Sequence, residues 1–473
     1  MNSDTKQTIN PNCPATAELA WVDEFITNVR PYIFVRLEDN LLIQRPNKAQ
    51  KLNPSGARIL KALLDGSPIN NLLTNLNPSP QQFKDISLFL LAVKHQLEGK
   101  LDEFTCNPAV ESRPFEMTFS SLPVLSEIAL TYRCNLSCAF CYAGCGCKSN
   151  GESSSPDMTA DQAIRILHLL YYDAKVPSVS FTGGEPTLIP FLPRLIREAK
   201  NLGMRVNLIT NGTLITRDFA IELAEHGLDS AQVSLEGTSA RTHDALVRSA
   251  GAFEKSVAAV HYLKNAGIAT HSNTTLTRLN MDDCSSMPAF VRDTLECERF
   301  SMNLIIPAGS GAINSDLVVR YSEIGPYIEA MILAAERAGV EFMWYSPVPM
   351  CMFNSVAHGL GNKGCSACDG LISIAPDGNV LPCSSCPDPV GNILKKPFHS
   401  IWQSGKARYY REKSFAFEAC KACSDFYMCH GACPLYWQKM GYDEIENYLT
   451  LNPDNLTNHQ PSTINHQPST INH

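Results

Sequence analysis

The chain has 473 residues, of which 44% are hydrophobic and 18% charged, and its formal net charge is −8. This length suits two or three domains, and the apolar content is sufficient for a buried core. The mildly acidic balance argues against broad binding to nucleic acid or to an anionic membrane. No apolar stretch approaches a membrane span and no secretion signal opens the chain, so we expect a cytoplasmic protein with neither kind of partner.

The N-terminal part is expected to hold one small α+β domain after a flexible start. Residues 1–29 are polar and form the expected flexible N-terminus. Alternating apolar residues on both sides of a polar turn predict a β-hairpin over 33–44. Helices are expected over 57–64 and 80–101, the second because its apolar residues recur at helical spacing. The domain is assigned to residues 30–105.

Strand-like and helical segments alternate through residues 120–345. Six such repeats predict an α/β fold with a parallel sheet, a partial (β/α)6 barrel of the TIM type. The expected strands are 125–130, 178–182, 205–210, 231–235, 268–276 and 300–306. The expected helices are 159–173, 190–202, 216–226, 252–266, 282–296 and 322–338.

Beyond residue 345 the repeat stops, and Gly, Pro and Cys dominate residues 346–440. Metal, rather than a large apolar core, is expected to organise such a region. Residues 441–473 end in a strict seven-residue repeat, NHQPSTINHQPSTINH. The repeat has no apolar face to bury, so this tail is expected to be disordered.

The chain has 18 cysteines, and most of them fall in two short zones. A chain of this length without a secretion signal does not favour a disulfide scaffold, whereas closely spaced thiolates can converge on one metal or iron–sulfur centre. The first zone begins with Cys134, Cys138 and Cys141, spaced C-x3-C-x2-C. Three thiolates can hold a four-iron cluster with one iron left open, or they can be ligands of zinc. Cys145 and Cys147 follow as bystander thiols or as substrate-handling or redox groups.

Polar residues and glycines gather at the ends of the next strands, where a parallel barrel places its ligand. Together with the cysteine spacing, they resemble the radical S-adenosylmethionine (SAM) superfamily over residues 120–345. The resemblance implies a four-iron cluster whose open iron chelates SAM, and a 5′-deoxyadenosyl radical formed by SAM cleavage. The implied SAM-binding residues are Phe140, Gly183, Gly184, Glu185, Asn211, Ser234, Glu236 and Arg248.

Individual roles follow from the chemistry of these side chains. Two glycines let the backbone approach a ligand, and the Glu185 carboxylate can accept hydrogen bonds from the methionyl ammonium. Ser234 and Glu236 stand where the superfamily contacts the ribose and the carboxylate. Phe140 would lie near the adenine or simply pack its loop, and Arg248 would pair with the SAM carboxylate or form a surface salt bridge.

The second cysteine zone resembles the SPASM extension of radical SAM enzymes, which carries two auxiliary four-iron clusters. Its motifs are C-x9-G-x4-C, ending at Cys383, and C-x2-C-x5-C-x3-C over 420–433. A zinc ribbon would need only four of these cysteines. The implied ligands of the first cluster are Cys368, Cys383 and Cys433 with Cys365 or Cys351, and those of the second are Cys420, Cys423 and Cys429. The usual later cysteine is missing, so Cys386, an oxygen ligand such as Asp, or no residue completes the second site.

Residues 30–103 resemble a PqqD-like leader-binding domain, also called a RiPP recognition element, with a winged-helix-like layout. The resemblance rests on the hairpin and on the Leu52–Ala57 and Leu64–Gly66 segments around the first helix. It implies that a leader peptide is bound as an added β-strand. A winged-helix DNA binder shares this layout, but ten Lys and Arg against seven Asp and Glu give little support for phosphate binding.

The sequence therefore predicts a radical SAM oxidoreductase that matures a ribosomal precursor peptide. We expect it to abstract hydrogen from the peptide and to receive electrons from a reductase such as flavodoxin or ferredoxin. The expected outcome is a carbon–carbon or carbon–sulfur crosslink, with excision or epimerisation as the alternatives. The auxiliary clusters would accept an electron or hold the substrate. One rival is an enzyme that modifies a folded protein, as sulfatase-maturing relatives do. The other is a non-catalytic iron–sulfur electron carrier.

Overall fold

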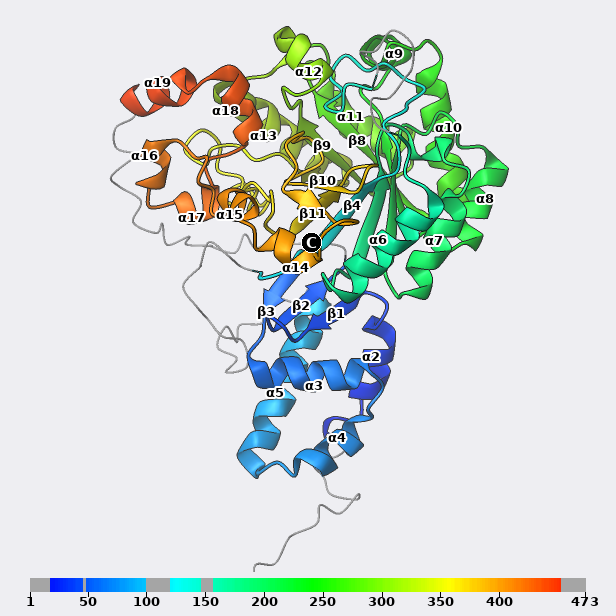
Figure 1. Ribbon diagram of the computed structural model, residues 1–473, viewed down its shortest axis with the longest axis vertical. Helices are drawn as coiled ribbons and strands as arrows, with labels where there is room; N and C mark the ends of the chain where they lie inside the picture. The colour runs from blue at the N-terminus through cyan, green and yellow to red at the C-terminus, as the bar shows by residue number, and fades with distance from the viewer. Residues whose placement is uncertain (1–17, 46–47, 99–119, 146–155, 452–473) are drawn as a thin grey trace, which may run out of the picture.

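The computed structural model describes residues 18–45, 48–98, 120–145 and 156–451 (Figure 1). A small N-terminal domain, a large α/β sheet and a C-terminal region of short helices and loops follow one another along the chain. The predictions for Cys147 and for the repetitive tail fall outside the described residues. Nowhere in the described chain is a helix long and apolar enough to cross a membrane.

The N-terminal domain has a three-stranded antiparallel sheet in the order β1-β2-β3. Its elements are α2 (Val22–Val29), β1 (Ile33–Arg36), β2 (Leu41–Gln44), β3 (Lys48–Lys51), α3 (Pro54–Leu64), α4 (Ile69–Leu76) and α5 (Pro80–Leu97). The predicted hairpin and both predicted helices are confirmed. Local capping explains the helix starts, because Asn53 accepts the Gly56 N–H and Ser79 forms a capping box with Gln82.

Part of this domain was assigned wrongly from the sequence. Residues 22–29, expected in the flexible N-terminus, form α2, whose Val22 and Ile26 are buried in the domain core. These two side chains are four residues apart and so lie on one helix face. The polar composition of the segment hides this short apolar stripe. The domain therefore begins before residue 30.

The α/β sheet contains the six predicted parallel strands in sequence order. They are β4 (Leu125–Ala129), β5 (Ser178–Thr182), β6 (Arg205–Thr210), β7 (Ser230–Ser234), β8 (Ala269–Leu276) and β9 (Arg299–Leu304). A further parallel strand, β10 (Glu341–Trp344), pairs with β9. Beyond β4, the sheet continues into the C-terminal region, so it is an open barrel rather than a closed one.

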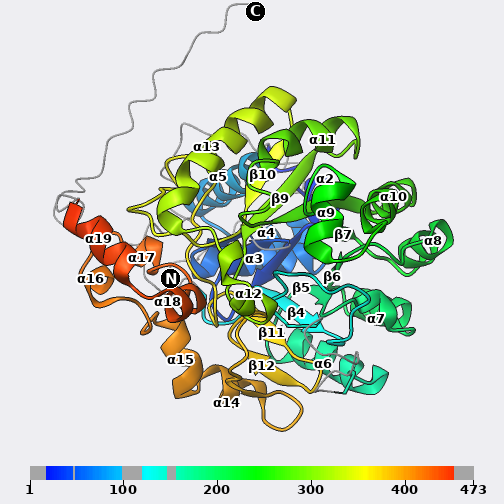
Figure 2. The same cartoon turned by 90° about the horizontal axis from the view of Figure 1, so that it is seen from above.

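The helices cover the outer face of this sheet, as the view from above shows (Figure 2). They are α6 (Ala160–Tyr172), α7 (Leu192–Asn201), α8 (Arg217–Glu225), α9 (Ala240–Val247), α10 (Ala252–Asn265), α11 (Met287–Asp293) and α13 (Tyr321–Ala338). The short helix α12 (Ser310–Ile313) lies instead at the carboxyl ends of the strands, where the Ser310 N–H donates to the Cys141 carbonyl. Five expected helices match to within two residues at each end. The expected helix 282–296 is instead a 3-10 turn over Cys284–Ser286 followed by α11.

The C-terminal region is built onto the edge of the barrel. Strand β11 (Leu371–Ile374) pairs in parallel with β4, then β12 (Asn379–Leu381) and β13 (Gly391–Asn392) follow antiparallel. Its helices are α14 (Phe398–Trp402), α15 (Gly405–Arg411), α16 (Glu418–Lys421), α17 (Phe426–Cys429), α18 (Pro434–Met440) and α19 (Asp443–Leu451). Helix α19 corrects the expectation of disorder from residue 441, because Ile445 is buried in the main core.

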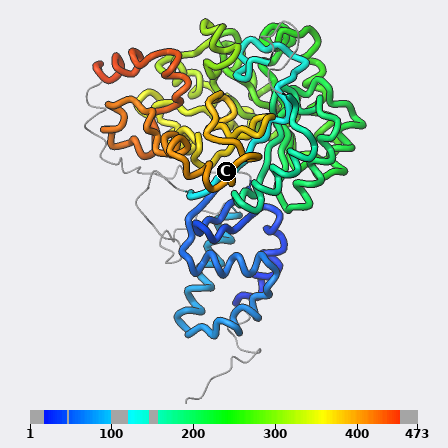
Figure 3. The backbone as a smooth tube through the Cα atoms, viewed as in Figure 1, coloured from blue at the N-terminus to red at the C-terminus, as the bar shows by residue number. Residues whose placement is uncertain are grey.

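The N-terminal domain is docked where the parallel strands begin (Figure 3). Arg45 donates to the carbonyl oxygen of Gly203, two residues before β6, at 2.9 Å. Arg36 donates to the carbonyl oxygens of Pro123 and Lys175, which precede β4 and β5, at 2.6 and 3.4 Å. The sheet of the small domain therefore covers the amino-terminal end of the barrel.

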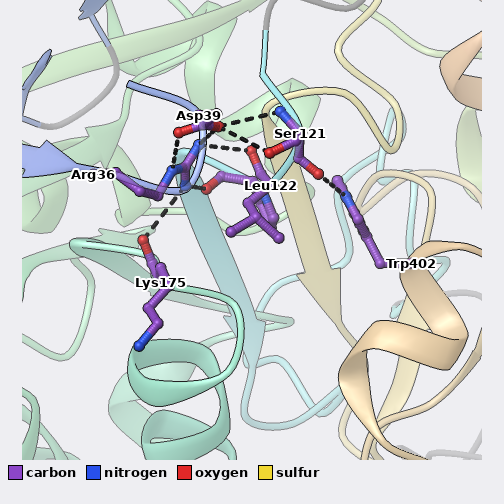
Figure 4. A network of polar contacts seen from close by, with 7 residues as sticks. Arg36, Asp39, Ser121, Leu122, Lys175 and Trp402 are labelled. Atoms are coloured by element: carbon purple, nitrogen blue, oxygen red, sulfur yellow. Dashed lines mark hydrogen bonds and ion pairs between the residues drawn. The ribbon is translucent and has the colours of Figure 1, made fainter. Parts of the chain in front are cut away.

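One buried polar network joins the three parts of the chain (Figure 4). The Arg36 guanidinium makes two hydrogen bonds of 2.8 Å with the Asp39 carboxylate. Asp39 accepts the N–H and the hydroxyl of Ser121, and the Ser121 carbonyl accepts the indole N–H of Trp402 at 2.9 Å. Trp402 ends α14, so the N-terminal domain, the start of the barrel and the C-terminal region meet at this point.

Candidate metal and cofactor site

Three free thiols lie in the loop that follows β4, at the end of the barrel opposite the N-terminal domain. Cys134, Cys138 and Cys141 are all half-buried. Burial raises the pKa of the Cys138 thiol, and the nearby Cys141 and Cys134 raise it further. The Leu136 N–H donates to Cys134 Sγ at 3.4 Å. The loop therefore holds the three thiols of the C-x3-C-x2-C motif close together.

Contacts from distant segments fix the shape of this loop. The Ala139 N–H donates to the carbonyl of Leu246 at 2.9 Å, and the Cys141 carbonyl accepts the Ser310 N–H at 2.8 Å. A Cβ on Gly309 would lie 2.5 Å from the Cys141 carbonyl oxygen. A glycine is required there because the two backbones are too close for any side chain.

The glycines that follow β5 also pack against the cysteine loop. The Gly184 N–H donates to the Thr131 carbonyl at 2.7 Å, and the Glu185 N–H to the Arg133 carbonyl at 2.9 Å. A Cβ on Gly183 would lie 2.2 Å from the Thr131 oxygen, and one on Gly184 would lie 2.2 Å from the Arg133 oxygen. The glycines were expected to make room for a ligand, but the contacts show that they let two neighbouring loops meet.

The Glu185 carboxylate is buried and bonded within the protein. Its Oε1 accepts the N–H and the hydroxyl of Thr187, at 3.0 and 2.6 Å, and the hydroxyl of Thr210 at 2.7 Å. Its Oε2 accepts the Asn211 N–H at 2.8 Å. These bonds tie the end of β5 to the end of β6. They favour a positioning role over the direct contact with a methionyl ammonium that the sequence suggested.

Asn211 connects the end of β6 to the cysteine loop. Its Nδ2 donates to Asn135 Oδ1 at 3.0 Å and lies 3.9 Å from Cys134 Sγ. Its Oδ1 accepts the Thr213 N–H at 2.9 Å, which fixes the orientation of the amide. The amide group therefore reaches one of the three thiols directly.

Glu236 offers a buried carboxylate at the end of β7, close to the half-buried Ser234. Its Oε2 accepts the Thr275 N–H at 2.7 Å, and its own N–H donates to His243 Nδ1 at 3.0 Å. Burial raises the pKa of Glu236 to about 8. Among the described residues Oε1 has no hydrogen-bond partner, so this oxygen is available to a polar ligand such as a ribose hydroxyl.

The two remaining SAM-binding predictions stay predictions. Phe140 is half-buried against the main core, so the contacts of simple loop packing are present. Arg248 is exposed at the end of α9, in the left-handed conformation. No carboxylate of the described residues forms an ion pair with it, so its guanidinium is not committed to a surface salt bridge.

Cys145 lies beside the three loop thiols, which the sequence alone did not predict. A hydrogen bond from the Cys145 thiol lowers the pKa of Cys141, and the same bond raises the pKa of Cys145. Cys145 also lies within electrostatic range of Cys134 and Cys138. Four sulfur atoms therefore gather in this loop.

The thiols of the C-terminal region fall into two groups. The first group gathers five cysteines, each near at least two others: Cys365, Cys368, Cys383, Cys386 and Cys433. Burial is the main cause of their raised pKa values where a shift is found, and mutual repulsion adds to it. Cys386, one of the alternatives for completing the other cluster, lies with this first group and contacts the Tyr410 hydroxyl at 3.6 Å.

Two buried cations stand beside the first group. Lys413 is fully buried, and its Nζ donates to the Cys365 carbonyl at 2.6 Å and lies 3.2 Å from the Asp369 carboxylate. Arg411 donates to the Cys368 carbonyl at 3.1 Å. A buried cation is costly unless a negative charge is close. Four thiolates around a cluster of iron and sulfide carry net negative charge, so these cations fit such an occupant.

The second group consists of Cys351, Cys420, Cys423 and Cys429. Burial raises the pKa of Cys351 to about 12, with further contributions from the other three thiols. Cys351 therefore lies with the C-x2-C-x5-C cysteines and not, as one reading of the sequence allowed, with Cys368 and Cys383.

The spacing of these thiols fits clusters better than single ions. In the described part of the chain, no three His, Cys, Asp or Glu side chains converge tightly enough to chelate one metal ion. A zinc site requires such tight convergence, with each sulfur about 2.3 Å from the ion. A four-iron cluster is larger and holds its thiolates further apart, and the described cysteines of all three groups are free thiols.

A small cavity with a mostly apolar surface lies inside the barrel, beside the loop thiols and the first C-terminal group. Glu127 of β4 lines it together with Tyr142, next to Cys141, and Ser384, next to Cys383. Burial raises the pKa of the Glu127 carboxyl, although Ser373 donates a hydrogen bond to it at 3.1 Å. The barrel interior thus contains a carboxyl group that can hold or take up a proton beside the two thiol groups.

A parallel α/β barrel with three loop thiols at its carboxyl end, followed by a region rich in buried thiols, defines an iron–sulfur enzyme that uses SAM. Residues 128–287 match the family model described as "Radical SAM superfamily", and residues 365–424 match the SPASM model, described as "Iron-sulfur cluster-binding domain". The chain therefore carries a radical SAM domain with SAM and a four-iron cluster as cofactors, and a SPASM domain with auxiliary clusters. It is a SAM-dependent enzyme of the oxidoreductase type.

Curated relatives and solved structures agree with this assignment. AdoMet-dependent heme synthase from Methanosarcina barkeri is 26% identical over 71% of this chain and 99% of the relative. PqqA peptide cyclase from Streptomyces rochei is 28% identical over 65% of this chain and 83% of the relative. The fold matches that of Streptococcus suis SuiB bound to precursor peptide SuiA, with a TM-score of 0.63 and 18% identity, covering 86% of this chain and 96% of SuiB.

Proposed function

We propose that this enzyme matures a ribosomally synthesised precursor peptide by installing a carbon–carbon or carbon–sulfur crosslink. The observation that carries the proposal is the small sheet domain docked to a radical SAM and SPASM core. Two similar proteins support the proposal: a PqqA peptide cyclase, and SuiB, whose structure contains its precursor peptide. The residues proposed to bind SAM are those assigned above, with Glu185 and Asn211 as positioning groups.

The N-terminal domain would bind the leader through an edge strand. Strand β1 ends in Arg36, which is locked in the joint with the barrel. Strand β3 forms the other edge, and its residues are exposed or half-buried. A leader peptide could pair with β3 in an extended conformation and add one strand to the sheet. Binding there raises the local concentration of the rest of the peptide near the barrel.

The atoms and electrons of the proposed reaction balance with the cofactors already assigned. SAM and its cluster supply a 5′-deoxyadenosyl radical when bound, after one electron arrives from a reductase such as flavodoxin or ferredoxin. The peptide loses one hydrogen atom to that radical, and closing the crosslink releases one more electron and one proton. Auxiliary clusters are one-electron acceptors of the required kind. The peptide therefore loses two hydrogen atoms for each crosslink.

Release of 5′-deoxyadenosine tests the radical site. Protein reconstituted anaerobically with iron and sulfide should cleave SAM when a reductant is added. Changing Cys134, Cys138 and Cys141 together to Ala should abolish the release, whereas Cys297→Ala, a buried thiol outside all three groups, should leave it intact. Undiminished cleavage in the triple variant would contradict the assignment of the loop.

Coexpression tests the peptide substrate. Each short open reading frame beside the gene would be coexpressed with the enzyme, and its product examined by mass spectrometry for loss of two hydrogen atoms. Removing residues 1–98 should abolish that change while SAM cleavage persists. Equal modification without the domain would favour a folded-protein substrate, salt-sensitive binding to duplex DNA would favour a winged-helix role, and heme formation without peptide modification would favour the activity named for the heme synthases.

A further inference from the structure

The second thiol group of the SPASM region contains one cysteine that its sequence motif does not supply. Cys420, Cys423 and Cys429 come from the C-x2-C-x5-C motif around α16 and α17. Residues 434–473 contain no cysteine, so they offer no fourth thiol. The fourth thiol in the structure comes from upstream, in the segment that follows β10.

Backbone contacts bring that upstream segment against α17. The Met350 N–H donates to Cys429 Sγ at 3.3 Å, so the residue before Cys351 already touches a thiol of the motif. The chain then turns, because the N–H groups of Met352 and Phe353 both donate to the Pro349 carbonyl, at 2.9 and 3.0 Å. This turn places Cys351 beside Cys429.

A second anchor holds the turn from the opposite side. The Tyr448 hydroxyl of α19 donates to the Cys351 carbonyl. Helix α19 is itself tied to the barrel, because Glu444 accepts the Ser322 N–H at 2.6 Å and the Tyr436 hydroxyl. Cys351 is therefore held between α17 and α19 on a well-anchored turn.

The alternative fourth ligand has other neighbours. The Cys386 N–H donates to the Cys383 carbonyl at 3.0 Å, which holds Cys386 beside a thiol of the first group. Its thiol contacts the Tyr410 hydroxyl at 3.6 Å. The first thiol group already contains four cysteines without it, so Cys386 is a fifth thiol beside a complete donor set.

We infer that Cys351 is the fourth thiolate ligand of the second auxiliary iron–sulfur cluster, together with Cys420, Cys423 and Cys429. The site is then an all-cysteine site with one ligand upstream of the C-x2-C-x5-C motif and three within it. Cys386 is an unligated thiol next to the first cluster. Helix α19, through Tyr448, positions the Cys351 turn.

Replacement of single cysteines in the full chain tests this assignment. Cys351→Ala should lower the iron and sulfide content by up to about one third, the share of one cluster in three, or convert that cluster to a three-iron form with a distinct magnetic resonance signal. Cys386→Ala is the matched control and should keep the full iron content and an unchanged spectrum. Both variants should still release 5′-deoxyadenosine, because the Cys134 loop is untouched.

A labelling experiment covers the case in which the alanine variant fails to fold. Wild-type protein, with and without clusters, is treated with a thiol-alkylating reagent and mapped by mass spectrometry. Cys351 should be protected together with Cys420, Cys423 and Cys429 in the cluster-loaded protein and should react once iron is removed. Equal labelling of Cys351 in both forms, or loss of one cluster in Cys386→Ala but not in Cys351→Ala, would overturn the inference.

Discussion

At the scale of single residues, Gly184 shows why a glycine in this motif cannot be replaced. The carbonyl oxygen of Arg133 occupies the place where its Cβ would stand, at 2.2 Å. Hydrogen bonds hold the backbone of both loops in place, so neither loop can move aside at low cost. The motif glycine thus controls the position of the cysteine loop without contacting a thiol.

A pair of glycine-to-alanine variants tests this role. Gly184→Ala should displace the cysteine loop and lower the iron content of the radical site, together with a stability loss of about 2 kcal/mol or more. Gly405→Ala, at a position with no atom within 4 Å of the new Cβ, should change neither. Iron analysis and thermal unfolding of both variants measure the difference, and equal iron retention would contradict the proposed packing role.

Glu236 should make the stability of the folded protein depend on pH. Burial raises its pKa to about 8, whereas an unfolded Glu titrates near 4.3. The folded protein therefore keeps a proton that the unfolded chain releases, so the stability due to this group is complete below about pH 4 and is lost as the pH rises through 8. The full difference is on the order of a few kcal/mol.

The Glu236→Gln variant should lack this dependence. Without SAM, the wild type should lose stability relative to the variant as the pH rises from about 5 to about 9. Chemical denaturation of both proteins across that range measures it. Parallel curves would mean that the carboxyl group titrates normally in the folded protein.

At the scale of elements, local patterns predicted most of the barrel, and contacts distant in sequence explain the misses. Strands β4 to β9 are continuous apolar or alternating segments that stand out from their turns. No local pattern predicts where strand β11 lies in the sheet, because it pairs with β4 across more than 240 residues. Helix α2 was missed for a related reason, since only the fold of its domain reveals what Val22 and Ile26 cover.

The same contrast between local patterns and contacts distant in sequence holds for the candidate site. The cysteine motifs and the strand-end residues are local in sequence, so their identity could be predicted. Which thiols share a site depends on how the chain returns on itself, so the grouping of Cys351 and Cys386 could not be predicted. Likewise, only the structure reveals the hydrogen bonds that join Glu185 to Thr187, Thr210 and Asn211.

Because β11 extends the barrel sheet, the barrel and the C-terminal region should unfold together. Ile372 of β11 is fully buried, so Ile372→Ala should cost about 2–5 kcal/mol. Val356→Ala, in an exposed loop of the same region, should cost less than about 0.5 kcal/mol. Denaturant curves followed by far- and near-ultraviolet circular dichroism should shift together, and two separated transitions in Ile372→Ala would contradict a continuous sheet.

At the scale of the whole molecule, the joint around Arg36 controls how the N-terminal domain is held. Its ion pair with Asp39 is almost completely buried, so removing one partner leaves an unpaired buried charge. Arg36→Ala should cost about 3–5 kcal/mol and loosen the domain from the barrel. Lys61→Ala removes the exposed Lys61–Asp65 pair of the same domain and should cost about 1 kcal/mol or less.

Unfolding and limited proteolysis of both variants measure this difference. Arg36→Ala should make the contact around Ser121 and Leu122 accessible to protease, while Lys61→Ala should match the wild type. If the two variants were equally stable, the buried network would not be what holds the domain in place.

For the proposed binding of a leader peptide, the docking of the small domain at the amino-terminal end of the barrel also sets a minimum length for the substrate. The loop thiols lie at the other end of the strands, and the eight residues of β8 correspond to a height of about 26 Å. A fully extended peptide covers about 3.4 Å per residue, so about eight residues must separate the leader from the modified side chain. A precursor with a shorter spacer should bind as tightly as the natural one and remain unmodified.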